Sequence, residues 1–235
     1  MVHRSIMNPT IINNIIQIDE EITKADPKYT ILFFDIDNTL FRTITDIGSD
    51  EWMRWQDSLL QQYNGNHKYL VINTRTALFE WYRNWMLTSN CLTELLEYET
   101  PKLLEKYSKM GFKIILITSR HKSLVDITIE QLKRHYDITH FYDNIFFTGG
   151  DHKGSYIKKI LQTMKNICTK KIFFVDDSYV EINNVLLEFY NSEIDVKVMH
   201  YVFAQKFKQI FDNIDKDQLH TKWLESNEKS ASTNK

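Results

Sequence analysis

The sequence has few glycines and cysteines, and this scarcity excludes several kinds of site. None of the six glycines forms a Gly-x-Gly-x-x-Gly or Gly-x₄-Gly-Lys-Ser/Thr loop, the usual cradles of nucleotide phosphates. Neither His-Glu-x-x-His nor Gly-x-Ser-x-Gly occurs in the 235 residues, so zinc-protease and α/β-hydrolase sites are disfavoured. The two cysteines, Cys91 and Cys168, suit a reducing compartment and give no argument for a disulfide.

A long apolar run, a basic stripe and a signal peptide are also missing. No apolar run approaches the length of a membrane span. A net charge of −2 without a basic stripe gives no footprint for nucleic acid. Residues 1–28 lack the basic-then-apolar pattern of a signal peptide. We therefore expect a cytoplasmic protein that binds neither nucleic acid nor a membrane, and the sequence leaves the oligomeric state open.

What the sequence does contain is three apolar runs that each end in polar groups. The runs at residues 31–34, 113–117 and 171–175 are typical of strands buried on both faces of a parallel sheet. The first leads into Asp35 and Asp37, the second into Thr118, and the third into Asp176 and Asp177. Ligands of open α/β sheets bind outside the carboxyl ends of the strands. The pattern predicts an α/β fold with an open, parallel, Rossmann-like sheet, helices on both faces and a polar site at one rim.

A lysine is also expected at this rim. Each of these polar residues, taken alone, has a purely structural explanation. Lys153 precedes a predicted helix over residues 155–164, and by itself it could be a solvated helix-start residue. An Asp-x-Asp pair can form a turn, and Asp176 with Asp177 can stabilise a helix N-terminus. Thr118 alone could simply bond to backbone. All four features in one order, three of them directly after buried strands, favour a catalytic site.

The order of these residues resembles the haloacid dehalogenase (HAD) superfamily of phosphotransferases. Asp35-Ile36-Asp37-Asn38-Thr39 is similar to its first motif, Thr118 to its second, Lys153 to its third and Asp176-Asp177 to its fourth. The resemblance covers residues 29–205. Residues 46–52, Asp-Ile-Gly-Ser-Asp-Glu-Trp, further resemble a HAD-like subgroup found in intracellular bacteria.

The resemblance implies a phosphomonoester hydrolase that works through an aspartyl-phosphate intermediate. Asp35 would be the nucleophile, and Asp37 would serve first as general acid and then as general base. Thr118 and Lys153 would hold the oxygens of the transferring phosphoryl group. An acid two residues after the nucleophile goes with hydrolysis in the resembled superfamily, whereas transporting ATPases carry Thr there.

The resemblance also implies Mg²⁺ as the cofactor. Its ligands would be the carboxylates of Asp35 and Asp176 and the backbone carbonyl of Asp37, with Asp177 nearby or acting through water. The charges support this reading, because two carboxylates 4 Å apart repel by about 4 kcal/mol at an effective dielectric near 20. Mg²⁺ relieves such repulsion and prefers oxygen ligands.

An insert separates the first motif from the second. We expect residues 1–48 and 100–225 to form the core domain, residues 49–99 a helical cap, and residues 226–235 a disordered tail. The insert holds four of the five tryptophans. Trp52 and Trp55 share a helix face, either as the cap's own core or as a surface that contacts substrate. Arg120 is a candidate for binding a second anionic group of the substrate, or is a surface residue.

Three functions are compatible with these features. The leading hypothesis is hydrolysis of a small phosphorylated metabolite, because a cap restricts access to small substrates. The second is a phosphoprotein phosphatase, for instance one translocated to a host cell, and the third is a non-catalytic HAD-fold binding protein. Three further elements are predicted: an amphipathic helix over residues 11–25 and strands over residues 144–148 and 196–202.

Overall fold

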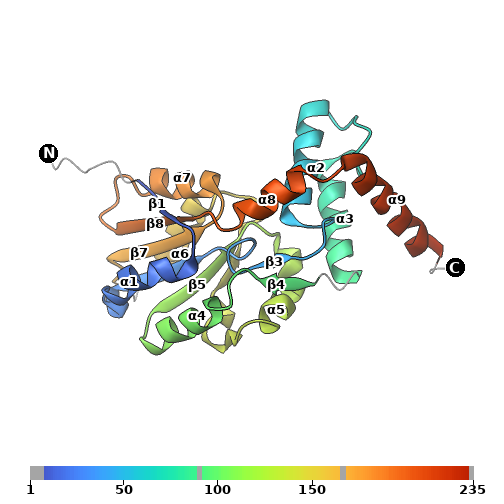
Figure 1. Ribbon diagram of the computed structural model, residues 1–235. Coiled ribbons are helices and arrows are strands. Elements are labelled where there is room, and N and C mark those ends of the chain that lie inside the picture. Colours follow the sequence, from blue (N-terminus) through green and yellow to red (C-terminus); the bar gives the residue numbers. More distant parts are fainter. Residues whose placement is uncertain (1–7, 89–91, 165–167, 233–235) are drawn as a thin grey trace. The chain divides into compact units, whose positions relative to one another are not determined.

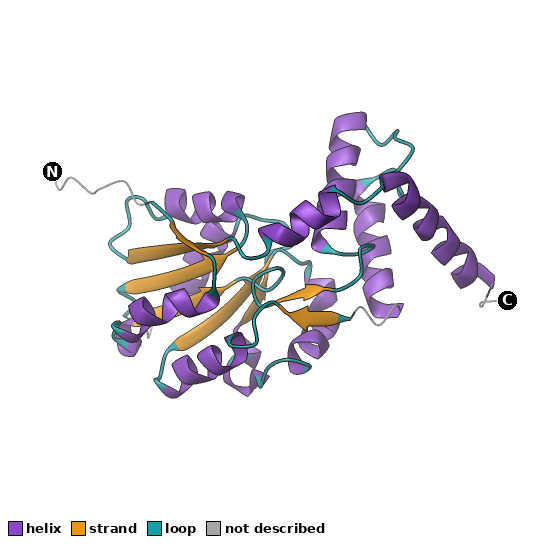
Figure 2. Ribbon diagram, viewed as in Figure 1, coloured by secondary structure: helices purple, strands orange, loops and turns teal. Residues whose placement is uncertain are grey.

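The computed structural model describes residues 8–88, 92–164 and 168–232, and Cys91 lies outside these ranges. Its main feature is a six-stranded sheet in the order β1-β8-β7-β2-β5-β6, in which the paired strands run parallel (Figures 1 and 2). The strands are Thr10–Ile12 (β1), Thr30–Phe34 (β2), Lys113–Thr118 (β5), Ile145–Phe147 (β6), Lys171–Asp176 (β7) and Asp195–Tyr201 (β8). The predicted open parallel sheet is confirmed, as are the strands expected near residues 144–148 and 196–202.

The three apolar runs form neighbouring central strands. All five residues of β2 are buried, as are five of the six in β5 and in β7. In the register of the sheet, Phe34 at the end of β2 is paired with Leu116 of β5 and Val175 of β7. Because the strands are parallel, the polar residues that follow them emerge at one edge of the sheet.

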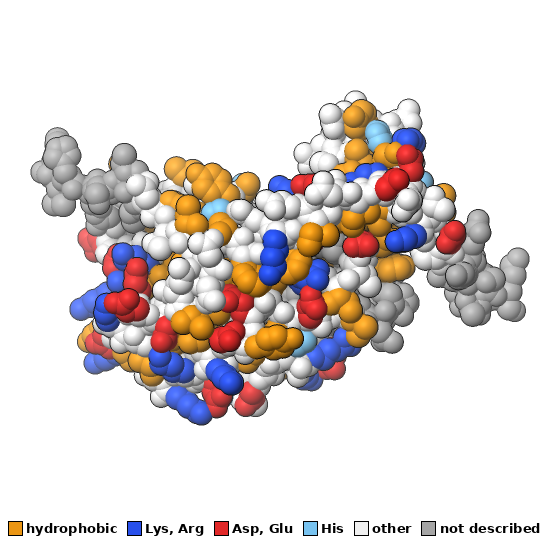
Figure 3. All heavy atoms as spheres, in the orientation of Figure 1, with side chains coloured by type: hydrophobic (Ala, Val, Ile, Leu, Met, Phe, Trp, Pro, Cys, Tyr) orange, Lys and Arg blue, Asp and Glu red, His pale blue; other side chains and the backbone are white. Residues whose placement is uncertain are grey.

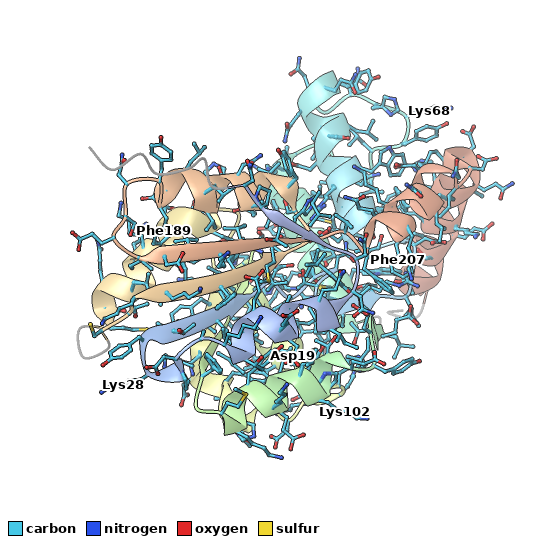
Figure 4. All side chains as sticks on the ribbon, turned by 60° about the vertical axis from the view of Figure 1, so that its left-hand side comes forward. Asp19, Lys28, Lys68, Lys102, Phe189 and Phe207 are labelled. Carbon is cyan, nitrogen blue, oxygen red and sulfur yellow. The ribbon has the colours of Figure 1, made fainter. Side chains whose placement is uncertain are left out.

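Helices cover both faces of the sheet. Helices α6 (Lys153–Thr163) and α7 (Tyr179–Glu188) share an apolar cluster with alternate residues of β2, β5, β7 and β8. Phe189, labelled in Figure 4, closes this cluster at the end of α7. Helices α1 (Asp19–Thr23) and α4 (Thr100–Lys109) lie in front of the sheet in Figure 1. Helix α5 (Val125–Lys133) follows β5, and right-handed crossovers put it on the face of α4.

The remaining elements are short or belong to the insert and the C-terminal region. Strands Phe41–Thr43 (β3) and Thr93–Leu95 (β4) form a second, two-stranded sheet. The other α-helices are Asp50–Tyr63 (α2), Arg75–Thr88 (α3), Gln205–Asp212 (α8) and Lys216–Ser232 (α9). Short 3₁₀ helices span Ile15–Ile18 (η1), Pro27–Tyr29 (η2), Lys122–Leu124 (η3), Ile138–His140 (η4) and Tyr142–Asn144 (η5).

The helix predicted over residues 11–25 is wrong. This segment starts as β1, continues as the 3₁₀ helix η1 and ends as α1. Asn14 interrupts it, because its side chain accepts a hydrogen bond from the Ile16 N–H and caps η1. The spaced isoleucines still bury one face, but strand pairing with β8 takes the first of them.

The chain divides into two compact units. The first comprises Met1–Arg42 with Leu95–Ala204, and the second Thr43–Glu94 with Gln205–Lys235. Helices α8 and α9 therefore group with the insert, whereas the sequence predicts residues 205–225 as part of the core. The reason is apolar packing: Phe211 and Leu219 are buried with Trp52 and Leu78 of the insert. Helix α9 extends to Ser232, into the segment predicted as a tail.

The surface of the first unit carries interspersed acidic and basic side chains (Figure 3). Exposed ion pairs such as Lys133 with Glu130 and Lys109 with Glu105 belong to this pattern and contribute little stability. Across the residues described, no helix combines the length and the apolar character that crossing a bilayer requires.

Candidate active site

Three aspartates gather at the carboxyl ends of β2 and β7. Asp35 directly follows β2, Asp176 is the last residue of β7, and Asp177 comes next. One carboxylate oxygen of each lies within 4.8 Å of the corresponding oxygens of the other two. Asp35 and Asp176 are buried, whereas Asp177 is half-buried. The strand order thus converts two distant sequence positions into one carboxylate cluster.

Lys153 bridges two of these carboxylates. Its ammonium Nζ donates to Asp35 Oδ1 and, over 2.7 Å, to Asp176 Oδ2. Its side chain is only 3% exposed, so the two ion pairs are shielded from water. The resemblance implies that Lys153 holds phosphoryl oxygens; in the structure its ammonium contacts the carboxylates of Asp35 and Asp176, and a contact with phosphate stays a prediction.

Contacts between α6 and α7 hold Lys153 in place. Its backbone N–H, at the first position of α6, donates to Glu181 Oε2 of α7 over 2.8 Å. Gly154 lets the two helices approach closely, since an added Cβ would lie 2.7 Å from the Asn184 carbonyl oxygen. Glu181 and Gly154 therefore fix the start of α6, and with it the base of the lysine side chain.

Both oxygens of the Asp35 carboxylate have partners. Thr39 Oγ1 donates to Asp35 Oδ2 over 3.1 Å, opposite the bond from Lys153 to Oδ1. Burial raises the pKa of Asp35 to about 8; Lys153 opposes this shift, while Asp176 and Asp37 add to it. Burial also opposes the charge of Lys153, but the carboxylates of Asp176 and Asp35 raise its pKa above the usual value.

The cluster suits a divalent cation. The three carboxylates carry −3 and the ammonium of Lys153 carries +1, so the ionised cluster has a net charge of −2. Its ligand atoms are hard oxygens on buried or half-buried side chains, as Mg²⁺ prefers. Further contacts hold this segment: the Ser178 N–H donates to Asp176 Oδ1 over 2.7 Å, and the His200 side-chain Nε2 lies 3.1 Å from the Asp177 carbonyl oxygen.

Asp37 lies beside this cluster and is paired with Arg120. The guanidinium donates from Nη2 to Asp37 Oδ1 over 2.7 Å and from Nε to Oδ2 over 2.8 Å. Arg120 is 7% exposed, so the surface alternative for this residue is wrong. Its Nη1 donates to Thr128 and Gln131 of α5 over 2.9 and 2.6 Å. Sequence reasoning missed these partners, whose only signal was the position of Arg120 two residues after Thr118.

Thr118 lies at the end of β5 and is buried. Its Oγ1 accepts a hydrogen bond from the Arg120 N–H over 3.1 Å and lies 3.5 Å from Asp37 Oδ2. The hydroxyl therefore accepts from the Arg120 backbone and donates a long hydrogen bond to Asp37. Thr39 is a further site residue, and its place within the Asp35–Thr39 motif was the available signal.

Trp52 and Trp55 lie on α2 in the second unit. Trp52 is 1% exposed, and its ring centroid lies 4.8 Å from that of Trp81. Trp55 is half-buried, with Tyr69 and Phe211 as ring neighbours. These contacts agree with the packing alternative for both tryptophans, and a contact with substrate stays a prediction.

Comparison with known proteins places the whole site within one family. The family described as "Protein of unknown function (DUF2608)" matches residues 11–230, which include every residue of the site. The chain belongs to the DUF2608 family. No curated protein sequence matches this DUF2608 member.

Among the solved structures that resemble this DUF2608 chain are two bacterial proteins. The class C acid phosphatase from Bacillus anthracis is 13% identical over 85% of each chain, with a TM-score of 0.42. The HAD domain of the effector protein Lem4 from Legionella pneumophila, an inactive mutant, is 15% identical. That alignment covers 83% of this chain and 97% of the other, with a TM-score of 0.35. Neither likeness says what the DUF2608 chain does, so its function has to be argued from its own site.

Proposed function

We propose that the chain is a HAD-like, Mg²⁺-dependent phosphomonoester hydrolase. The observation that carries the proposal is the cluster of Asp35, Asp176 and Asp177, two of them buried and one half-buried, whose carboxylate oxygens lie within 4.8 Å of one another. Asp37 follows Asp35 by two residues, and the ammonium of Lys153 contacts the carboxylates of Asp35 and Asp176. Buried charges destabilise a fold unless they are paired, so such a cluster indicates a functional site.

In the first chemical step, Asp35 is the nucleophile. One carboxylate oxygen of Asp35 attacks phosphorus, so an O–P bond forms as the bond to the leaving oxygen breaks. Thr39 and Lys153 orient the attacking carboxylate through their hydrogen bonds to its two oxygens. Asp37, which is protonated at the start of this step, gives its proton to the leaving oxygen and becomes the carboxylate that pairs with Arg120. Thr118 Oγ1 and Lys153 Nζ are the groups that would donate to the oxygens of the phosphoryl group.

The second step returns the nucleophile. Asp37 takes a proton from water, the water oxygen attacks phosphorus, and the bond between phosphorus and Asp35 breaks to release inorganic phosphate. Mg²⁺, held by Asp35, Asp176 and the backbone carbonyl of Asp37 with Asp177 nearby, would offset the negative charge of the phosphoryl oxygens in both steps. The substrate we propose is a small phosphorylated metabolite.

Hydrolysis of 4-nitrophenyl phosphate with and without Mg²⁺ tests the proposal. We expect release that depends on Mg²⁺ and that Asp35→Asn abolishes, because the amide is not a nucleophile. Glu105→Gln, a change of an exposed acid on α4 in the first unit, is the matched control and should keep full activity. A folded wild-type protein that releases no phosphate from this ester or from a panel of small phosphate esters and phosphopeptides would instead support a binding role.

A further inference from the structure

We propose that Arg120 is a positioning residue, which holds the Asp37 carboxylate in the orientation that proton transfer requires. The inference rests on the proposed function and adds to it a residue that acts through Asp37 rather than on the substrate. Arg120 makes a two-point contact in which Nη2 and Nε meet the two oxygens of Asp37 over 2.7 and 2.8 Å. A planar guanidinium that binds a carboxylate at two points fixes its plane as well as its distance.

Arg120 is itself held from behind by α5. Thr128 Oγ1 and Gln131 Oε1 accept from its Nη1 over 2.9 and 2.6 Å, and both residues are fully buried. They are three residues apart, so they share one face of α5. The guanidinium carbon also lies 5.6 Å from the centroid of the Phe41 ring. A rotation of Arg120 would leave buried polar atoms unpaired, which disfavours it.

Asp37 needs this restraint from Arg120 because it lies in a partly exposed loop after β2. It follows the last residue of β2 by three positions and precedes Asn38, which has a positive φ of 60°. Its side chain is 22% exposed, so packing restrains it less than it restrains Asp35. The Thr118 hydroxyl lies 3.5 Å from Oδ2, too far for a strong hydrogen bond. The guanidinium is therefore the strongest restraint on the orientation of Asp37.

The pairing also argues against a role for Arg120 in binding substrate. Its four hydrogen bonds to Asp37, Thr128 and Gln131 use most of the five N–H groups of a guanidinium. A residue that binds a substrate anion is expected to lower KM, whereas a residue that aims Asp37 is expected to raise kcat. The two roles thus predict different kinetic effects.

A double-mutant cycle in kcat tests the proposal, with 4-nitrophenyl phosphate as substrate. Arg120→Lys keeps the charge but loses the two-point contact, and we expect kcat to fall about 10- to 100-fold with KM changed less than about threefold. In an Asp37→Asn background the same substitution should lower kcat no further, because there is no carboxylate to position. Arg134→Lys, at an exposed arginine just after α5, is the matched control and should leave both constants unchanged.

A second, milder variant covers the case in which Arg120→Lys fails to fold. Gln131→Leu removes one anchor of the guanidinium, and we expect a fall in kcat of about three- to tenfold that also disappears in the Asp37→Asn background. Losses that multiply in the double variants, or a higher KM with unchanged kcat, would overturn the positioning role alone. A wild-type protein without Mg²⁺-dependent activity would overturn the proposed function, and this inference with it.

Discussion

The raised pKa of Asp35 predicts how the stability of the metal-free protein depends on pH. In the unfolded chain this carboxyl has the ordinary pKa of 3.8, whereas burial raises it to about 8 in the folded protein. Between these values the folded state binds one proton more than the unfolded state, so the free energy of unfolding falls as pH rises. A difference of about four pKa units corresponds to at most about 6 kcal/mol, and to about 3 kcal/mol between pH 5 and pH 7.

Asp35→Asn removes this dependence, because the amide does not titrate. We would measure the free energy of unfolding of both chains by urea denaturation, in a chelator, at pH 5, 6 and 7. Histidines also titrate in this range, but they are common to both chains and cancel in the difference between them. The stability of the wild type relative to the variant should fall by about 3 kcal/mol from pH 5 to pH 7.

Mg²⁺ provides the matching control for this experiment. Binding requires the ionised carboxylates, so saturating Mg²⁺ should stabilise the wild type more at pH 7 than at pH 5. A difference between the two chains that stays constant from pH 5 to pH 7 in the chelator would refute the reasoning. It would mean that Lys153 fully offsets the burial of Asp35.

Three further outcomes follow from the same structure. Mg²⁺ at about 100 times its Kd should add about 2.7 kcal/mol to the free energy of unfolding, seen as a higher Tm, and Asp176→Asn should lose most of that shift; an unchanged shift would contradict the assigned ligand. Gly154→Ala should lower the free energy of unfolding by about 1–3 kcal/mol and reduce activity, since its methyl group would meet the Asn184 carbonyl; denaturation curves identical to wild type would contradict this packing. Trp52→Ala should destabilise the second unit by about 3–5 kcal/mol, measured by thermal unfolding, because it empties a buried site against Trp81; a loss below about 1 kcal/mol would show that the ring is not packed as described.

The sequence by itself determined the central sheet and the residues at its rim. The runs ending at Phe34, Ile117 and Val175 are apolar throughout, which is typical of strands buried on both faces of a sheet. Parallel strands end at one edge, so the sequence could predict that Asp35 and Asp176 lie at the same rim, while the pairing of β2 with β7 brought them into contact distance. The local pattern was enough to find these strands, because a strand buried on both faces has to be made of apolar residues.

Only the tertiary structure decided which side chains pair at that rim, and which strands and helices pack together elsewhere. Arg120 binds Asp37 at two points and is itself bound by Thr128 and Gln131 of α5, and Lys153 contacts two carboxylates. These hydrogen bonds join residues between 8 and 118 positions apart. Residues 11–25 look helical by period, yet pairing with β8 makes their start a strand. Likewise, α8 and α9 group with the insert because Phe211 is buried against it. These pairings depend on which surfaces contact each other in the folded protein. Hydrophobic periodicity reports only local structure, so it does not identify a partner that is distant in the sequence.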